Sequence, residues 1–277
     1  MATGSHEAGF EQLDLFSGAG AAPAPDAESI GWAPVDPARL SDADLIAVLP
    51  KARQVEAPGL AQEAARRGLA EAIPALEALC RRFSGFGLDR EVTEQVAALR
   101  GLTALGGRAE VTRLIVAGAV RGPGIRVALE AAAELGCRVP VAAFLRDDHP
   151  EVREAACRCA RGRAEEISGL IDLLTDLHPG VVHAAALALG RLGRREAHAI
   201  LAGLLLTAPS KDVVGALAVI AEDDDWVRLG QTAMRVPELA AEVFEVLEES
   251  EAPRALAVAE GLRRRLGGSV TGAPDGR

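Results

Sequence analysis

The sequence contains no tyrosine and only two tryptophans, Trp32 and Trp226, and aromatic residues make up 3% of its 277 residues. Strands are enriched in aromatic and β-branched residues, whereas alanine and leucine, which dominate here, are strong helix formers. No stretch alternates between apolar and polar residues as a half-buried strand would. The composition therefore predicts an all-α protein whose helices pack closely through small side chains.

Cysteine is also scarce, and its spacing disfavours two kinds of site. Among the four cysteines, Cys80, Cys137, Cys157 and Cys159, there is no C-x-x-C pair. Cys157 and Cys159 lie two positions apart in a predicted helix, so their side chains point to different faces. We expect all four to be small buried hydrophobic residues in a reducing compartment rather than disulfide partners or zinc ligands.

The chain lacks a surplus of basic residues, and its formal net charge is −10. Dedicated nucleic-acid binders gain much of their affinity from phosphate contacts, so we do not expect direct nucleic-acid binding. The N-terminus lacks the basic and then apolar pattern of a secretory signal. The longest apolar runs, such as residues 199–206, are far shorter than a membrane span. These features predict a cytoplasmic protein without a membrane partner.

Composition divides the chain into a helical region and two tails. Residues 1–38 and 267–277 hold few large apolar residues to bury, and we expect both to be disordered. Residues 39–266 contain closely spaced helix signals. The first is Ser41, which is followed three residues later by Asp44 and then by an apolar run, a pattern typical of a helix N-terminus.

The main feature of the helical region is a repeat. Residues 147–156 (DDHPEVREAA) have a counterpart in residues 176–185 (DLHPGVVHAA), and their prolines lie 29 residues apart. Five prolines follow one another at spacings of 27 to 30 residues: Pro123, Pro150, Pro179, Pro209 and Pro237. Each is predicted to open a helix rich in alanine, valine and leucine. The fit loosens after Pro209, because Val213 lies two residues late in its repeat.

Each repeat is predicted to hold a helix that begins at the proline, a turn, and a second helix. In the clearest repeat the first helix spans residues 179–189 and the turn spans residues 191–193. The inner face of the second helix is formed by Ile200, Leu201, Leu204 and Leu205. A single pair cannot cover its own apolar face, so such units stack into arrays. Small residues should let the first helices approach closely: Ala155, Ala156, Ala184 and Ala185.

The pattern D-x-H-P-x-V-x-x-A-A with a glycine-bearing turn resembles the short HEAT-like repeats of the PBS-lyase type. The resemblance is clear over residues 150–205 and weaker over residues 89–262. It implies a right-handed α-solenoid of HEAT-like helix pairs over residues 89–266, with residues 39–88 as an atypical N-terminal capping layer. Such arrays mostly bind other macromolecules, so the resemblance implies a protein-interaction scaffold and not an enzyme.

Two histidines, His149 and His178, occupy equivalent repeat positions beside Asp147, Asp148 and Asp176. One interpretation is a metal site. However, successive repeats stack about 8–10 Å apart, too far for two ligands to share an ion without help. The favoured interpretation is that the aspartates and histidines cap the helices that begin at the prolines.

Arginines cluster around the turns of the same repeats: Arg153, Arg158, Arg161, Arg163, Arg191, Arg194 and Arg195. They predict either a basic ridge for phosphate or an acidic partner, or a solvated edge where arginines near helix C-termini favour the helix dipole. No Ser-His-Asp arrangement, phosphate-cradling glycine loop or zinc spacing is present. We therefore assign no catalytic, metal or cofactor residues. A HEAT-like enzyme, such as a bilin lyase or a DNA glycosylase, is the weaker alternative, since exposed nucleophilic cysteine and clustered aromatics are lacking.

The N-terminal tail contains the pentapeptide Gln12-Leu13-Asp14-Leu15-Phe16. All five positions match the Q-L-[SD]-L-F peptide by which bacterial polymerases and repair factors dock on the DNA sliding clamp. The resemblance implies that Leu15 and Phe16 enter an apolar pocket while Gln12 supplies a polar anchor. The chain would then be a bacterial adaptor tethered to the clamp. The alternatives are a chance match, or a hydrophobic cap on the first helices of a plain scaffold in another cytosolic assembly.

Overall fold

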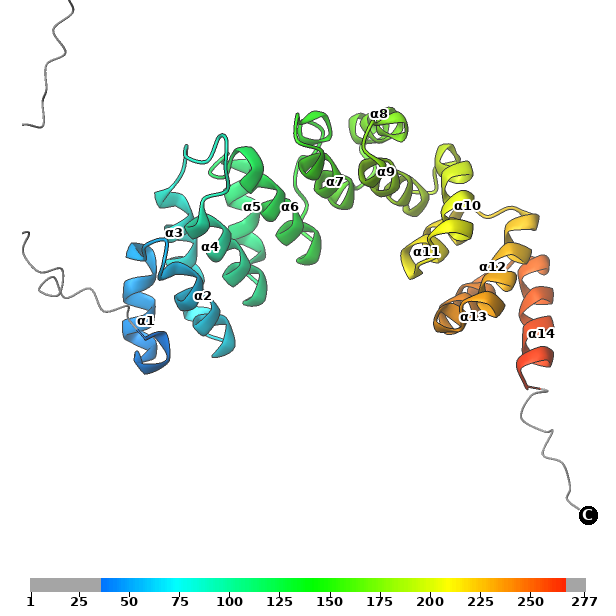
Figure 1. The fold of residues 1–277 in the computed structure, drawn as a ribbon, viewed down its shortest axis with the longest axis horizontal. Coiled ribbons are helices and arrows are strands. Elements are labelled where there is room, and N and C mark those ends of the chain that lie inside the picture. The colour runs from blue at the N-terminus through cyan, green and yellow to red at the C-terminus, as the bar shows by residue number, and fades with distance from the viewer. Residues whose placement is uncertain (1–35, 268–277) are drawn as a thin grey trace, which may run out of the picture. The chain divides into compact units, whose positions relative to one another are not determined.

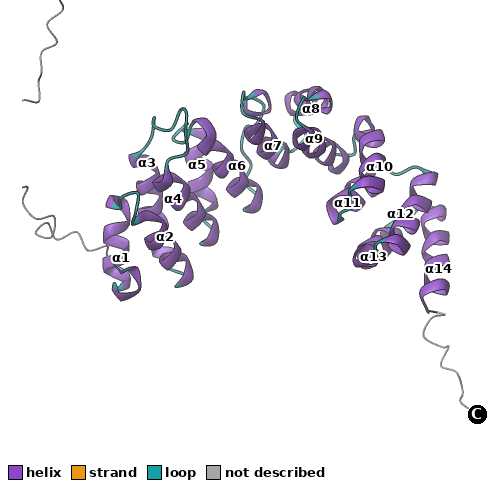
Figure 2. Cartoon of the chain, viewed as in Figure 1, coloured by secondary structure: helices purple, strands orange, loops and turns teal. Residues whose placement is uncertain are grey.

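The structure is a computed structural model that describes residues 36–267. Over these residues it contains fourteen α-helices and no strand (Figure 1; Figure 2), which confirms the predicted all-α fold. None of the described helices is both long enough and apolar enough to cross a membrane. The tails predicted over residues 1–38 and 267–277 fall almost entirely outside the described residues, and their disorder stays a prediction.

Seven of the described helices form what we call the first row, in which each helix packs against the next member. They are α2 (Ala57–Arg66), α4 (Thr93–Ala104), α6 (Ile125–Glu134), α7 (Pro150–Cys159), α9 (Pro179–Arg191), α11 (Lys211–Ile220) and α13 (Ala240–Glu249). Their mutual contacts build a continuous apolar core along the chain. This consecutive stacking is the solenoid arrangement that the repeat predicts.

The remaining helices follow members of the first row and form a second row, preceded by a short initial helix. They are α1 (Asp42–Val48), α3 (Ile73–Arg82), α5 (Arg108–Val116), α8 (Ala164–Asp172), α10 (His198–Thr207), α12 (Asp223–Arg235) and α14 (Pro253–Gly267). The helices α3, α5, α8, α10 and α12 each pack against the first-row helix that follows them in the chain. The apolar face of each helix pair is therefore covered in part by the next pair, and no pair buries its apolar face alone.

The prolines begin helices, as predicted, in the two clearest repeats. Pro150 and Pro179 are the first residues of α7 and α9, where the missing proline N–H would have no partner in the helix anyway. Pro209 differs, because α11 begins two residues later. Ser210 caps that helix by accepting a hydrogen bond at Oγ from the N–H of Val213 at 3.3 Å. This shift explains why Val213 lies late in its repeat.

One repeat lacks the second helix that we predicted for every unit. After α6 the chain forms only a short 3-10 helix at Phe144–Arg146 before α7 begins. Pro140 stands in this segment, and proline both removes a backbone donor and blocks a helix interior. Val139, Val141 and Leu145 are nevertheless buried. Side chains therefore fill the place of the missing helix, and the core stays continuous.

Small residues set the distance between first-row helices. The alanines predicted at these contacts are all buried: Ala155, Ala156, Ala184 and Ala185. Between α9 and α11 the approach is closer still at Gly190. A Cβ atom at Gly190 would lie 2.6 Å from Leu201 Cδ1 and 2.9 Å from the carbonyl oxygen of Ala216. A larger residue at this position would have to push the two helices apart.

The cysteines are part of the core, as predicted. All four have free thiols and are buried: Cys80, Cys137, Cys157 and Cys159. The Cys159 thiol lies 3.1 Å from the carbonyl oxygen of Leu129, one repeat earlier. Burial raises the pKa of Cys80 and of Cys157 to about 12. Since the thiolate is the nucleophile, such thiols are almost unreactive at neutral pH.

A buried carboxylate ties α10 to α12. The side chain of Asp225 is 1% exposed, and its Oδ2 lies 2.6 Å from Nε2 of His198. The same oxygen accepts the N–H of Glu222 at 3.0 Å, and Oδ1 accepts Nη1 of Arg228 at 3.0 Å. Burial raises the pKa of Asp225, but these hydrogen bonds and the charges of His198 and Arg228 outweigh it and hold the pKa below its ordinary value. The carboxylate is thus favoured in its charged form.

This contact predicts an acid-sensitive contribution to stability. We expect Asp225→Asn to lower the free energy of unfolding at neutral pH by about 2 kcal/mol, because the charge-assisted hydrogen bonds are lost. Since the folded pKa is depressed, the stabilisation is complete well above 3.8, the ordinary value, and is lost as the pH falls through the folded pKa. The stability difference between the two proteins should therefore shrink in acid. Urea titrations at several pH values measure it, with the exposed Asp148→Asn as the control. A difference that persists unchanged into strong acid would contradict this assignment.

Candidate partner-binding surface

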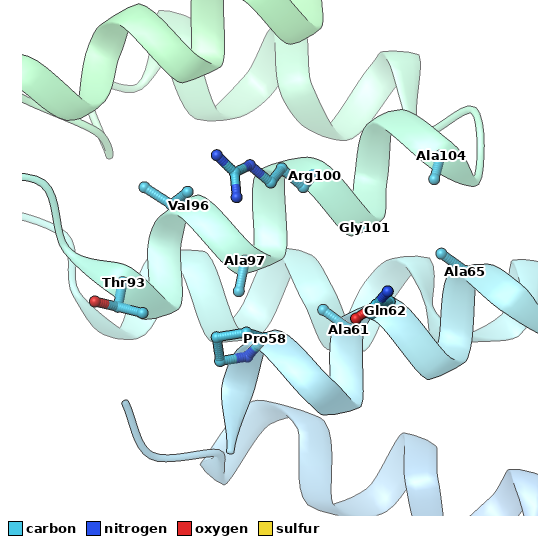
Figure 3. A pocket seen from close by; sticks show the side chains of 10 residues that line it. All are labelled: Pro58, Ala61, Gln62, Ala65, Thr93, Val96, Ala97, Arg100, Gly101 and Ala104. Atoms are coloured by element: carbon cyan, nitrogen blue, oxygen red, sulfur yellow. The ribbon is translucent and has the colours of Figure 1, made fainter. Parts of the chain in front are cut away.

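Grooves open between consecutive helices along the exposed side of the first row. The first groove lies between α2 and α4 and has a volume of about 440 Å³. Its walls are mostly apolar, with Pro58, Ala61 and Ala65 on α2 facing Val96 and Ala97 on α4 (Figure 3). Pockets of this size and character are typical of binding sites for apolar groups.

The first groove exists because its two helices carry small residues where they meet. Gly101 of α4 packs over Leu76 of α3, and a Cβ atom at Gly101 would lie 3.0 Å from Leu76 Cδ1 and 3.5 Å from Ala61 Cβ. Beyond this contact, Ala65 and Ala104 are too short to close the space between the helices. The result is a mostly apolar groove between the two helices.

One charged side chain lines the first groove, and it also lines the second. Arg100 is exposed on α4 and stands between the first groove and a groove of about 330 Å³ shared by α4 and α6. The wall of the second groove on α6 carries Val127, Glu130 and Glu134. The two grooves therefore differ in character, since the first is mostly apolar and the second is acidic along α6.

A third groove of about 270 Å³ lies between α7, α9 and α11. Its lining mixes both signs of charge: Glu154, Arg158, His183, Arg191 and Asp212. Arg158 forms an ion pair with Glu154, four residues earlier on the same helix. Two residues of the predicted basic ridge, Arg158 and Arg191, thus meet in one groove, but carboxylates accompany them.

The predicted ridge residue Arg153 lies elsewhere and joins two repeats. Its side chain is 14% exposed, and it donates from Nε and Nη2 to the two carboxylate oxygens of Asp176 at 2.9 and 3.0 Å. Nη1 also donates to the backbone oxygens of Asp147 and Asp148. The hydrogen bond from Arg153 is the largest cause that lowers the pKa of Asp176. Arg153 is therefore engaged within the fold, although its place beside the turn suggested a free cation.

This difference predicts unequal effects for two neighbouring arginines. We expect Arg153→Met to lower the free energy of unfolding by about 3 kcal/mol, because it leaves the nearly buried Asp176 without its counter-ion. Arg161→Met is the matched control, since Arg161 is exposed and has no ion pair among the described residues. Its effect should stay within about 0.5 kcal/mol. Chemical denaturation of both variants measures the difference, and equal effects would show that the Arg153–Asp176 contact is dispensable.

Of the other ridge residues, Arg191 and Arg195 are exposed and Arg194 is half-buried. Arg194 pairs with Glu196 at 2.6 Å, and Arg195 approaches Glu222 at 3.6 Å. Arg191 is exposed and forms no ion pair within residues 36–267. The structure therefore does not bring the arginines of the predicted ridge into one continuous cationic surface, and their role in partner binding stays a proposal.

The two repeat histidines do not cap helices with their side chains. Instead the preceding aspartates bind the histidine backbone: Oδ1 of Asp147 accepts the N–H of His149 at 2.9 Å, and Oδ1 of Asp176 accepts that of His178 at 2.8 Å. Each aspartate therefore closes a tight turn three residues ahead of its helix. Neither the aspartate nor the imidazole side chains cap α7 or α9, so the capping interpretation is wrong. Within the described residues no three His, Cys, Asp or Glu side chains are grouped to hold a metal ion.

One predicted site cannot be compared with the structure, and one candidate residue in the structure was not predicted. The pentapeptide from Gln12 to Phe16 lies outside the described residues, so its role stays a prediction. Arg100 was not among the predicted site residues. Its signal was present, because Arg100 is the only charged residue in the apolar run from Val96 to Gly107.

A comparison with protein families agrees with the fold. A family model of HEAT repeats matches residues 139–221, a range that includes α7 to α11. The described residues thus form a helical solenoid, and the match supports HEAT-like repeats over residues 139–221. The crystal structure of an engineered protein is similar at 19% sequence identity, with a TM-score of 0.33, over 83% of this chain and 98% of that chain. No curated protein matches the sequence significantly.

Proposed function

We propose that the protein is a non-enzymatic scaffold that binds protein partners along the exposed side of the first row. The observation that carries this proposal is the succession of grooves between stacked helices, which offers separate binding sites on one connected support. Helical arrays with such extended surfaces suit macromolecular ligands better than small molecules. The similarity of residues 139–221 to HEAT repeats supports a role in protein interaction.

The second part of the proposal is a tether to the bacterial DNA sliding clamp through Gln12, Leu13, Asp14, Leu15 and Phe16. The support is the match of all five positions to the clamp-binding peptide. The peptide and the grooves consist of different residues, so the proposal assigns the clamp and a second partner to separate parts of the chain. The chain would then be an adaptor that brings this partner to the clamp. The arginines Arg158 and Arg191 in the third groove are proposed contacts for acidic groups of that partner.

Titration of the full chain into a purified bacterial sliding clamp tests the tether. We expect saturable binding with a dissociation constant in the micromolar range, as for other short linear motifs. Absence of binding at high micromolar concentration would leave only the plain scaffold. Capture of partners from native cytosol, with the full chain and an Arg158→Glu, Arg191→Glu variant in parallel, then tests the scaffold. A partner lost with the variant identifies the third groove as its site.

A further inference from the structure

Within residues 36–267, Arg100 is a cation without an ion-pair partner on a mostly apolar groove. It is the one charged residue that lines the first groove, and no carboxylate lies within 4.0 Å of its guanidinium among the described residues. Figure 3 shows its side chain extended along α4 beside Val96, with the guanidinium above the helix. The guanidinium of arginine is weakly hydrated and binds carboxylates in a fixed planar geometry, so Arg100 is suited to pair with a carboxylate of a ligand.

The two acidic residues of the second groove do not form ion pairs with Arg100. Glu130 faces it across the second groove, but this carboxylate accepts Nη1 of Arg126 at 2.9 Å. Arg126 also binds Glu91 at 2.6 Å, so these three side chains form their own network. Glu134 lines the second groove further along α6 without reaching Arg100. A carboxylate that entered from the first groove would therefore find Arg100 free to pair.

We propose that the first groove binds an apolar segment of a partner protein that carries one aspartate or glutamate, and that this carboxylate pairs with Arg100. This rests on the scaffold role proposed above and names the chemistry of one of its ligands. The walls at Pro58, Ala61, Val96 and Ala97 cover the apolar side chains of the segment. Arg100 at the rim fixes its orientation, because only one direction brings the acid to the guanidinium.

The pairing also makes the groove selective. The protein carries a net charge of −10, so a partner with a generally acidic surface is repelled at long range. A segment with a single carboxylate among apolar residues is repelled much less. At physiological salt, the charges of the protein that lie more than about 8 Å from this carboxylate are largely screened. Binding at the first groove should therefore weaken only modestly with added salt and depend strongly on one acidic position.

A selection experiment tests the proposal even though the partner is unidentified. A phage-displayed library of random peptides of about twelve residues is selected on the full chain, and individual peptides are then titrated by fluorescence anisotropy. We expect a group of binders that combine apolar residues with one aspartate or glutamate. Arg100→Glu should weaken these peptides by about tenfold or more, whereas Arg100→Lys should retain part of the affinity. Replacing the acidic residue of the peptide with lysine should restore binding to Arg100→Glu.

Matched variants locate the site. Ala65→Leu places extra volume in the first groove and should also weaken the same peptides, because Ala65 lines its wall. Ala109→Leu on α5 is the control for added volume, and Arg138→Glu is the control for charge reversal, since both residues are exposed and lie away from the grooves. Circular dichroism confirms that each variant keeps its helices.

Three outcomes would overturn the proposal. Selected peptides without a carboxylate would show that Arg100 does not direct recognition. Peptides that bind Arg100→Glu as tightly as the native chain, but lose affinity with Arg158→Glu, would place the ligand in the third groove and leave the scaffold role intact. Selection of no peptides would show that the first groove does not bind apolar segments with one carboxylate. Titration with the clamp would still test the tether separately, because the tether depends on residues 12–16.

Discussion

Ala185→Asp should unfold the middle of the array. Ala185 is fully buried on α9, and α9 packs against both α7 and α11. A carboxylate at this position would be surrounded by apolar side chains with no cation to pair, so we expect the free energy of unfolding to fall by about 4 kcal/mol. In a linear array each repeat is supported by its neighbours alone, so the defect should also separate the two halves. Thermal melting followed by circular dichroism should show a lower and broader transition.

The control for this prediction is Ala257→Asp. Ala257 is exposed in the middle of α14, so the same change in charge and helix propensity meets water instead of the core. Its effect on stability should stay within about 0.5 kcal/mol. If Ala185→Asp melted at the same temperature as the native chain, the assignment of Ala185 to the contact between first-row helices would be wrong.

The repeat predicted the first row well because its evidence is local. Proline fixes a helix start through its own ring, and the alanines that follow it mark the face on which the next helix packs. Pro150, Pro179 and the buried Ala184 and Ala185 all lie where this reasoning places them. The same logic predicted the buried faces of both helices in the repeat that begins at Pro179.

The sequence was less informative where a contact joins distant residues. Arg153 and Asp176 stand 23 positions apart, and only the stacking of α7 on α9 brings them together. In the sequence, Arg153 is one of several clustered arginines, and nothing nearby indicates that it forms an ion pair while Arg161 stays exposed. The missing helix after α6 was overlooked for a related reason. The proline spacing is nearly preserved there, although a loop that contains the buried Val139 and Val141 replaces the second helix.

The grooves could not have been predicted from periodicity. A groove is the space left between two helices, and it depends on the volume of residues on both sides as well as on their separation. Ala65 and Ala104 looked like ordinary helix-forming residues, yet their small size leaves the first groove open. By contrast, the clamp-like pentapeptide lies outside the described residues, and its proposed role rests on the sequence match alone.

A peptide that spans Phe10 to Gly18 should bind a bacterial sliding clamp by itself, with a dissociation constant in the micromolar range. Replacing Leu15 and Phe16 together with alanine should abolish this binding. Anchors of this kind each contribute about 2 kcal/mol or more, and the loss of about 4 kcal/mol raises a micromolar constant to the millimolar range. Isothermal titration of the native and doubly substituted peptides measures the difference. A scrambled peptide of the same composition is the control for nonspecific attraction by the apolar residues.

The same double substitution in the full chain decides between the tether and the cap. If the pentapeptide serves the clamp, Leu15→Ala with Phe16→Ala removes clamp binding and leaves the melting temperature of the helical region unchanged. If it serves as a hydrophobic cap on the first helices, the native peptide fails to bind the clamp. The substituted chain then melts at a lower temperature, because the apolar surface of the first helices that the cap covered becomes exposed. The two interpretations thus predict opposite pairs of results. A native peptide that stays unbound at high micromolar clamp, together with an unchanged melting curve, would contradict both and leave the match a chance one.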